Sequence, residues 1–159
     1  MLPDIPSPQK NTHEPISPME LFDLASELGD AADELPNETL TPEAIDEVAR
    51  ANKKPRAHAW AALAVNPNLT LEMQTDTVFA ICAGRCQGQG AIPVLEKALE
   101  IRERRIANGQ KSFDIVPRHC LDLCDHAPVG ISKSAHGQAA HPKLTPENLE
   151  EITSTLCDS

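Results

Sequence analysis

Apolar positions in the first part of the chain recur at helical spacing. Ser17, followed by Pro18 and by Glu20 at the third helical position, forms a capping signal that starts a helix. Three leucines continue it on one face: Leu21, Leu24 and Leu28. Gly29 is expected to end this helix, and the acidic segment 30–40 is expected to be a loop.

Two further helices are predicted before residue 70. Thr41-Pro42 repeats the start signal, and the apolar stripe that follows consists of Ile45, Val48 and Ala49. Pro55 separates this helix from a third one at residues 56–65, which Asn66-Pro67 is expected to end. Because each helix is short, the bundle needs support from the rest of the chain.

The pattern changes near residue 75. Residues 77–81 predict a buried strand, and a glycine-rich turn follows it. A helix is predicted at 91–107, with Asn108-Gly109 as its stop. Short strands come next: 113–116, 129–131 and, as a further candidate, 138–140. Pro117 indicates an edge strand or a strand end, and Thr145-Pro146 starts a last capped helix.

The element order predicts an α/β fold. From residue 76 the order is β-α-β-β-α, with a parallel first pair of strands and an antiparallel later pair. This is the order of a thioredoxin-like core that lacks its first strand and helix. We therefore expect a disordered tail at 1–16, a small helical bundle at 17–70 and a thioredoxin-like domain at 75–159.

Composition and charge exclude some classes of function. The net charge is −10 and aromatic residues make up 3%, so the basic stripe and stacking platforms typical of nucleic-acid binding are missing. The acidity indicates solubility or a surface that docks a basic partner. The longest apolar run, 59–65, is too short to span a bilayer, and the start lacks the apolar stretch of a signal peptide. We expect a soluble, cytoplasmic protein without membrane insertion.

Four of the five cysteines form two pairs of equal spacing. Cys82 and Cys86 form one C-x3-C pair, Cys120 and Cys124 form another, and 33 residues lie between the pairs. Each pair follows a predicted strand, and both strands end at the same sheet edge, so the thiols can converge on a metal. This spacing leaves both zinc and an iron–sulfur cluster open, whereas a thioredoxin-type dithiol needs C-x-x-C. Cys157, far away in sequence, is interpreted as a spare thiol.

The surroundings of the cysteines suit a negatively charged cluster. Cys86 lies just before a predicted helix start, where free N–H groups favour negative charge. Three glycines allow the backbone to approach closely: Gly84, Gly88 and Gly90. Four flanking side chains could offset the charge, although solvated surface positions are the simpler explanation for each: Arg85, Arg118, His119 and His126.

At these motifs the chain resembles the thioredoxin-like [2Fe–2S] ferredoxins. It is most similar to the small peripheral iron–sulfur subunit of complex I-type NADH dehydrogenases, which also occurs in NAD(P)-linked hydrogenases and NAD-dependent formate dehydrogenases. The resemblance covers residues 41–156 and is carried by the stretches 82–91 and 120–128, the second of which matches C-L-x-x-C-x-x-x-P fully. Leu144-Thr145-Pro146-Glu147 resembles the start of the family's last helix. The family's first pair is usually C-x4-C, whereas this chain has C-x3-C.

The resemblance implies a one-electron carrier. It implies one [2Fe–2S] cluster held by Cys82, Cys86, Cys120 and Cys124, no catalysis by the isolated chain, and a larger partner subunit that binds flavin and NAD(P). A chain that stands alone is expected to be a homodimer. Two alternatives stay open: a zinc-stabilised or metal-free interaction module on the same fold, and a thiol enzyme or redox sensor.

Overall fold

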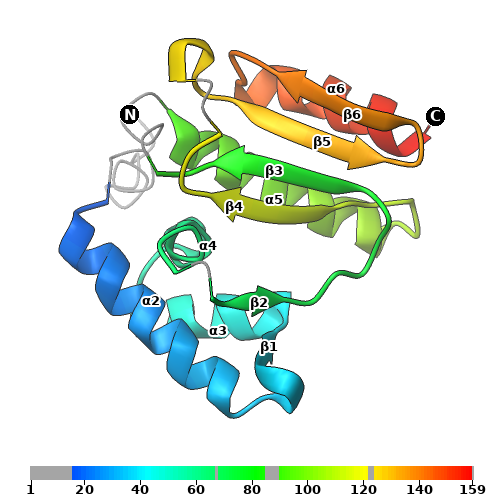
Figure 1. Ribbon diagram of the computed structural model, residues 1–159. Helices are drawn as coiled ribbons and strands as arrows, with labels where there is room; N and C mark the ends of the chain where they lie inside the picture. The colour runs from blue at the N-terminus through cyan, green and yellow to red at the C-terminus, as the bar shows by residue number, and fades with distance from the viewer. Residues whose placement is uncertain (1–15, 67, 85–89, 122–123, 159) are drawn as a thin grey trace, which may run out of the picture.

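The computed structural model describes residues 16–66, 68–84, 90–121 and 124–158. Figure 1 shows a helical segment below a four-stranded sheet, with two long helices behind that sheet. The chain is therefore a mixed α/β protein, as the element order predicts. Within the described ranges, no helix has both the length and the hydrophobicity needed to cross a bilayer.

The first helix, α2 (Pro18–Asp33), begins where the sequence predicts. Ser17 is its N-cap, and the Ser17 hydroxyl accepts a hydrogen bond from the Glu20 N–H at 3.2 Å. The predicted stop at Gly29 is wrong. The helix continues for another turn because Ala32, one turn beyond Leu28, is buried in the core together with it.

The boundary of the expected tail also needs correction. Residues 1–15 lie outside the described residues, but Ile16 is buried, with 7% of its surface exposed, and belongs to the core. Ile16 precedes the N-cap and Leu21 is the fourth helical residue, which are the two positions of a hydrophobic staple. Ile16 therefore belongs to the helical segment and not to the tail.

Two more helices complete the helical segment. The predicted helix start at Thr41 is confirmed, because the Thr41 hydroxyl caps α3 (Pro42–Ala51). The regular helix α4 (Arg56–Ala62) ends three residues before the predicted end at Val65, and residues 63–65 form turns. Two short segments that the sequence analysis missed, β1 (Thr39–Leu40) and β2 (Thr70–Leu71), pair in parallel beside these helices. The short 3-10 helix η1 (Pro36–Glu38) precedes β1.

The four-stranded sheet has the order β4-β3-β5-β6. Its strands are β3 (Val78–Cys82), β4 (Asp114–Arg118), β5 (Gly130–Ser134) and β6 (Gly137–His141). The predicted pairing is confirmed, since β3 and β4 are parallel, while β5 pairs antiparallel with both β3 and β6. The candidate strand at 138–140 is β6, so the observed order is β-α-β-β-β-α. The predicted order β-α-β-β-α omits this strand.

Two helices cover one face of this sheet. Figure 1 shows α5 (Ala91–Ala107) behind β3 and β4, and α6 (Pro146–Asp158) behind β5 and β6. The bounds predicted for α5 and its stop at Gly109, which has a φ of +70°, are confirmed. One hydrophobic core runs from the helical segment into the sheet, and its largest fully buried side chains include Trp60, Phe79, Phe113 and Leu95.

A polar network fixes the amino-terminal end of β4. Asp114 and Arg102 are both buried, and their charged groups lie 3.7 Å apart. The Asp114 carboxylate accepts the backbone N–H groups of Gln74 and Thr75, each at 2.8 Å. Arg102 donates to the Phe113 carbonyl at 3.0 Å and to the Gln74 side chain at 2.8 Å. This network ties the segment that leads into β3 to the start of β4.

Candidate functional site

Cys82 is the last residue of β3 and lies where the first cysteine loop begins. It is paired in register with Arg118, the last residue of β4. Only 1% of Cys82 is exposed, and its sulfur lies 3.6 Å from the carbonyl oxygen of His119. Its N–H donates to the Val129 carbonyl at 3.1 Å. Strand pairing therefore places Cys82 beside the loop that carries the second cysteine pair.

The two loops touch through their backbones just beyond the strands. The Ala83 N–H donates to the Arg118 carbonyl at 2.7 Å. A Cβ added to Gly84 would collide with the His119 carbonyl oxygen and would lie 2.5 Å from His119 Nδ1. Glycine is therefore required at position 84 for this approach. The predicted meeting of the two loops at one sheet edge is confirmed for the part of each loop that the structure describes.

Cys120 directly follows His119 and is half-buried at the same edge. The structure thus brings Cys82 and Cys120, one cysteine of each pair, to the same edge of the sheet. Cys86 and Arg85 lie outside the described residues, and so does Gly88. Cys124 begins the short 3-10 helix η3 (Cys124–His126), which follows Cys120 closely in the same loop.

Cys157 lies elsewhere in the molecule. It is buried near the end of α6, where Arg105, close to the C-terminal end of α5, is one of the charges that act on it. Burial raises the pKa of the Cys157 thiol above its usual value. Because the N-terminal end of α5 is the end near the second cysteine loop, Cys157 sits at the far end of that helix.

Small apolar side chains surround the Cys82 sulfur. Cys82, Ala91, Ala127 and Val129 form a buried cluster separate from the main core, and Leu121 packs partly against it. These residues come from β3, the start of α5 and the second cysteine loop. A sulfur ligand at this position would be shielded from water, which strengthens its electrostatic interactions with nearby dipoles.

The N-terminus of α5 faces the second cysteine loop. Gly90, the N-cap, has a φ of +97°, and a Cβ added there would lie 3.7 Å from Pro128 Cγ. The Leu144 N–H donates to the Pro128 carbonyl at 2.7 Å, and the Lys143 N–H to that of His126 at 2.8 Å. The first amides of a 17-residue helix therefore lie beside the site, where they favour negative charge.

The flanking polar side chains are solvent-facing. Arg118, His119 and His126 are all exposed. Among the residues that the structure describes, no group of three or more His, Cys, Asp or Glu side chains could hold a metal ion. Of the four predicted ligands, the structure describes the side chains of two, Cys82 and Cys120.

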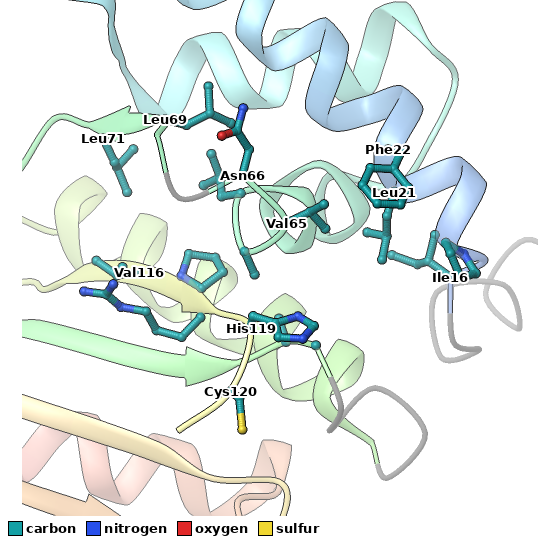
Figure 2. A pocket seen from close by; sticks show the side chains of 17 residues that line it. Ile16, Leu21, Phe22, Val65, Asn66, Leu69, Leu71, Val116, His119 and Cys120 are labelled. Atoms are coloured by element: carbon teal, nitrogen blue, oxygen red, sulfur yellow. The ribbon is translucent and has the colours of Figure 1, made fainter. Parts of the chain in front are cut away.

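The sequence analysis missed a groove beside the site. This α2–β4 groove, of about 1010 Å³, lies between the start of α2, the connection that follows α4 and the end of β4. Figure 2 shows Phe22 and Leu21 at one side of it, and His119 with Cys120 at the other. No local pattern predicts this groove because its walls come from four segments that are separated in sequence: 16–22, 63–71, 83–84 and 116–120.

Comparison with known proteins adds no relative. No protein-family model matches the sequence, and no curated protein is significantly similar to it. The residues and their geometry are therefore the basis for inferring a function.

Proposed function

We propose that the protein is a one-electron carrier that binds a single [2Fe–2S] cluster through Cys82, Cys86, Cys120 and Cys124. One observation carries the proposal: the two loops that bear the cysteine pairs meet at one sheet edge, where the Cys82 sulfur lies 3.6 Å from the carbonyl of the residue before Cys120. All-cysteine ligation by four thiolates is the usual way to hold this cluster.

The sheet supports a thioredoxin-like arrangement for this site. The order β4-β3-β5-β6 contains the parallel first pair and the antiparallel later pair on which the sequence-based expectation of such a core depends. Both long helices pack on one face of the sheet. In this arrangement the carboxyl ends of β3 and β4 carry the two cysteine loops.

The described surroundings fit a buried anionic group. When bound, the cluster would supply a reversible store for one electron. The protein's own residues would shield and stabilise this group. Ala91, Ala127 and Val129 exclude water from the Cys82 side, and the start of α5, with the positive end of the helix dipole, lies beside the second loop. Gly84 lets the two loops close together without a side chain between them.

The proposed function also implies the kind of partner with which the chain exchanges electrons. Hydride chemistry needs a nucleotide site, and the glycines at 84–90 are interleaved with cysteines, unlike a dinucleotide-binding fingerprint. We therefore assign flavin and NAD(P) binding to a larger partner subunit with which this chain exchanges single electrons. A homodimer is the corresponding state of a chain that acts without that subunit.

Metal analysis tests the proposal directly. Protein purified without oxygen is expected to be red-brown, with about two irons and two labile sulfides per chain. Replacing any one ligand with serine, as in Cys82→Ser or Cys120→Ser, should remove most of the iron. Cys157→Ser is the matched control because it also removes a buried thiol, but at the far end of α5.

Two outcomes would contradict the assignment. Colourless protein with one zinc per chain would favour the zinc-stabilised interaction module, for which C-x3-C is also a suitable spacing. Iron lost from the Cys157→Ser variant but kept by Cys82→Ser would show that the ligand set is wrong.

A further inference from the structure

The α2–β4 groove is apolar along most of its length. Its walls include Ile16 and Leu21 near the start of α2, Leu69 and Leu71 after α4, and Val116 of β4. Figure 2 shows these side chains on both sides of the space between the helical segment and β4. Apolar surface of this extent beside a functional site is typical of a binding surface.

An exposed aromatic side chain lies at the mouth of the groove. The chain has four aromatic residues, three Phe and one Trp. Trp60, Phe79 and Phe113 are at most 1% exposed, whereas Phe22 is 63% exposed and lines the groove. Leaving a large apolar ring in water is unfavourable, and aromatic rings dominate the energetics of protein interfaces. Phe22 therefore marks this groove as an interaction surface.

Charge determines which kind of occupant fits. Arg118 lines the groove, and no Asp or Glu belongs to the described residues that line it. The outer surface of α2, in contrast, exposes acidic residues, among them Asp23, Glu27 and Asp30. A second copy docked by a two-fold axis over the groove would bring two acidic helices together, which is unfavourable.

Size and shape favour a protein segment over a small molecule. Small-molecule pockets of up to about 1,000 Å³ enclose most of the ligand surface. This groove of about 1010 Å³ is open to solvent along Phe22, so it leaves one side of an occupant uncovered. Its inner end reaches Gly84 and Cys120, and an occupant would therefore lie against both cysteine loops.

We propose that the α2–β4 groove docks an apolar segment of a protein partner, with a carboxylate of that segment placed against Arg118. The identification of this partner as the electron-exchange partner rests on the proposed function. The apolar part of the segment covers Phe22 and Leu21, and the carboxylate neutralises the positive charge of Arg118. Docking in this orientation brings the partner to the cysteine loops.

Labelled peptides of equal length test the chemistry of the groove. Four kinds are compared by fluorescence anisotropy with the full-length protein: apolar with one Asp, apolar and neutral, apolar with one Lys, and polar with one Asp. The apolar peptide with Asp is expected to bind most tightly. Phe22→Ser should weaken that binding about tenfold, equivalent to about 1.4 kcal/mol. Arg118→Gln should abolish the preference for Asp over the neutral peptide.

Two matched controls separate the groove from the general surface. Met19→Ser removes a side chain that is 76% exposed on the same helix but does not line the groove. Lys133→Gln removes an exposed cation of β5, also outside the groove. Both variants should bind the apolar peptide with Asp as tightly as the unchanged protein. Equal loss of binding in Met19→Ser and Phe22→Ser would overturn the proposal.

Other occupants give different results. If the variant without residues 1–15 binds the peptide ten times more tightly, this segment occupies the groove in the full-length protein. A dimer in sedimentation that Phe22→Ser dissociates would identify a second copy. Anilinonaphthalene sulfonate, an anionic aromatic dye, would indicate a small-molecule site if it bound more tightly than every peptide. Each of these outcomes overturns the partner assignment.

Iron content measured on the same samples keeps the two proposals apart. Colourless protein that still binds the apolar peptide with Asp would refute the cluster but not the groove. Red-brown protein with two irons that binds all four peptides equally would refute the groove but not the cluster.

Discussion

The two ends of the β3–β4 pair are held by different chemistry. At the amino-terminal end, Asp114 and Arg102 form a buried polar network in which each charged group also has hydrogen-bond partners. At the carboxyl end, Cys82 and Gly84 meet the second cysteine loop through backbone hydrogen bonds and small apolar contacts. One parallel strand pair thus has a charged, fully partnered end and an end built from small side chains.

The difference indicates that the two ends of the strand pair have different roles: the polar network stabilises the fold, and the cysteine end carries the candidate site. A buried ion pair is tolerated only where its remaining donors and acceptors are satisfied, and such a network fixes local geometry. At the cysteine end, the described residues that pack with Cys82 are apolar, and most of them have small side chains. Polar anchoring at one end therefore leaves small apolar side chains at the other end, where the proposed cluster would bind.

The largest effect is expected at the polar end. Asp114→Ala would leave the Arg102 charge and the amides of Gln74 and Thr75 without their buried acceptor. We expect the free energy of unfolding to fall by about 3–5 kcal/mol, the usual cost of breaking a buried pair. Urea denaturation measures it. Arg50→Ala, which breaks the exposed pair with Glu47, is the control and should change little.

A smaller loss of stability is expected at the cysteine end. Gly84→Ala would push the first loop away from the carbonyl of His119, and overpacking of this kind costs about 1–3 kcal/mol. Iron content should fall with it because the loops separate. Gly29→Ala is the matched control: it lies within α2 with nothing within 4 Å, so it should stabilise by about 0.5–1 kcal/mol. A stable, iron-loaded Gly84→Ala protein would contradict the close-approach argument.

The hydroxyl of Thr75 tests how much a single side-chain hydrogen bond adds to the stability of the Asp114–Arg102 network. Thr75 Oγ1 lies 2.8 Å from the Thr77 carbonyl and 3.2 Å from Asp114 Oδ2. Thr75→Val keeps the shape but removes this partner, and thermal unfolding should show a loss of about 1 kcal/mol. Ser112→Ala, which removes a hydroxyl 3.2 Å from the Arg102 carbonyl, serves for comparison. An unchanged midpoint for Thr75→Val would show that the backbone amides alone hold Asp114.

The smallest effect concerns pH near the cysteine end. His141 stacks on Phe79 and its Nε2 lies 2.8 Å from Ser132 Oγ, and burial lowers the pKa of this imidazole. The unfolded chain therefore binds the proton more readily. The stabilising contribution is complete above the unfolded pKa of about 6.5 and is lost as the pH falls through the folded pKa. His141→Gln should flatten this part of the pH–stability curve, and a curve identical to that of the unchanged protein would disprove the effect.

Local signals predicted the elements well. The caps at Ser17 and Thr41 and the stop at Gly109 depend on residues adjacent in sequence, and all three are observed. The helix does not end at Gly29 because burial of Ala32 in the core stabilises another helical turn. The local sequence pattern does not reveal this burial. The pairing of β1 with β2 was missed because each strand has only two residues and their partners lie 31 positions apart.

The candidate site was predictable in part. The equal spacing of the cysteine pairs, each after a strand, indicated that the loops meet, because parallel strands end at the same edge. The contact between Gly84 and His119 and the exposure of Phe22 depend on the packing of distant segments, and spacing alone could not supply them.

Pro117 gives β4 a further property. Because the N–H of Asp114 and the carbonyl of Arg118 both point toward β3, the alternation of the strand turns the backbone of Pro117 toward the outer edge of the sheet. Proline has no N–H, so an incoming strand from another molecule would find no donor at this position of the edge. This edge of the sheet therefore offers an incoming strand fewer backbone partners, and a segment that docks beside it must be recognised through side chains.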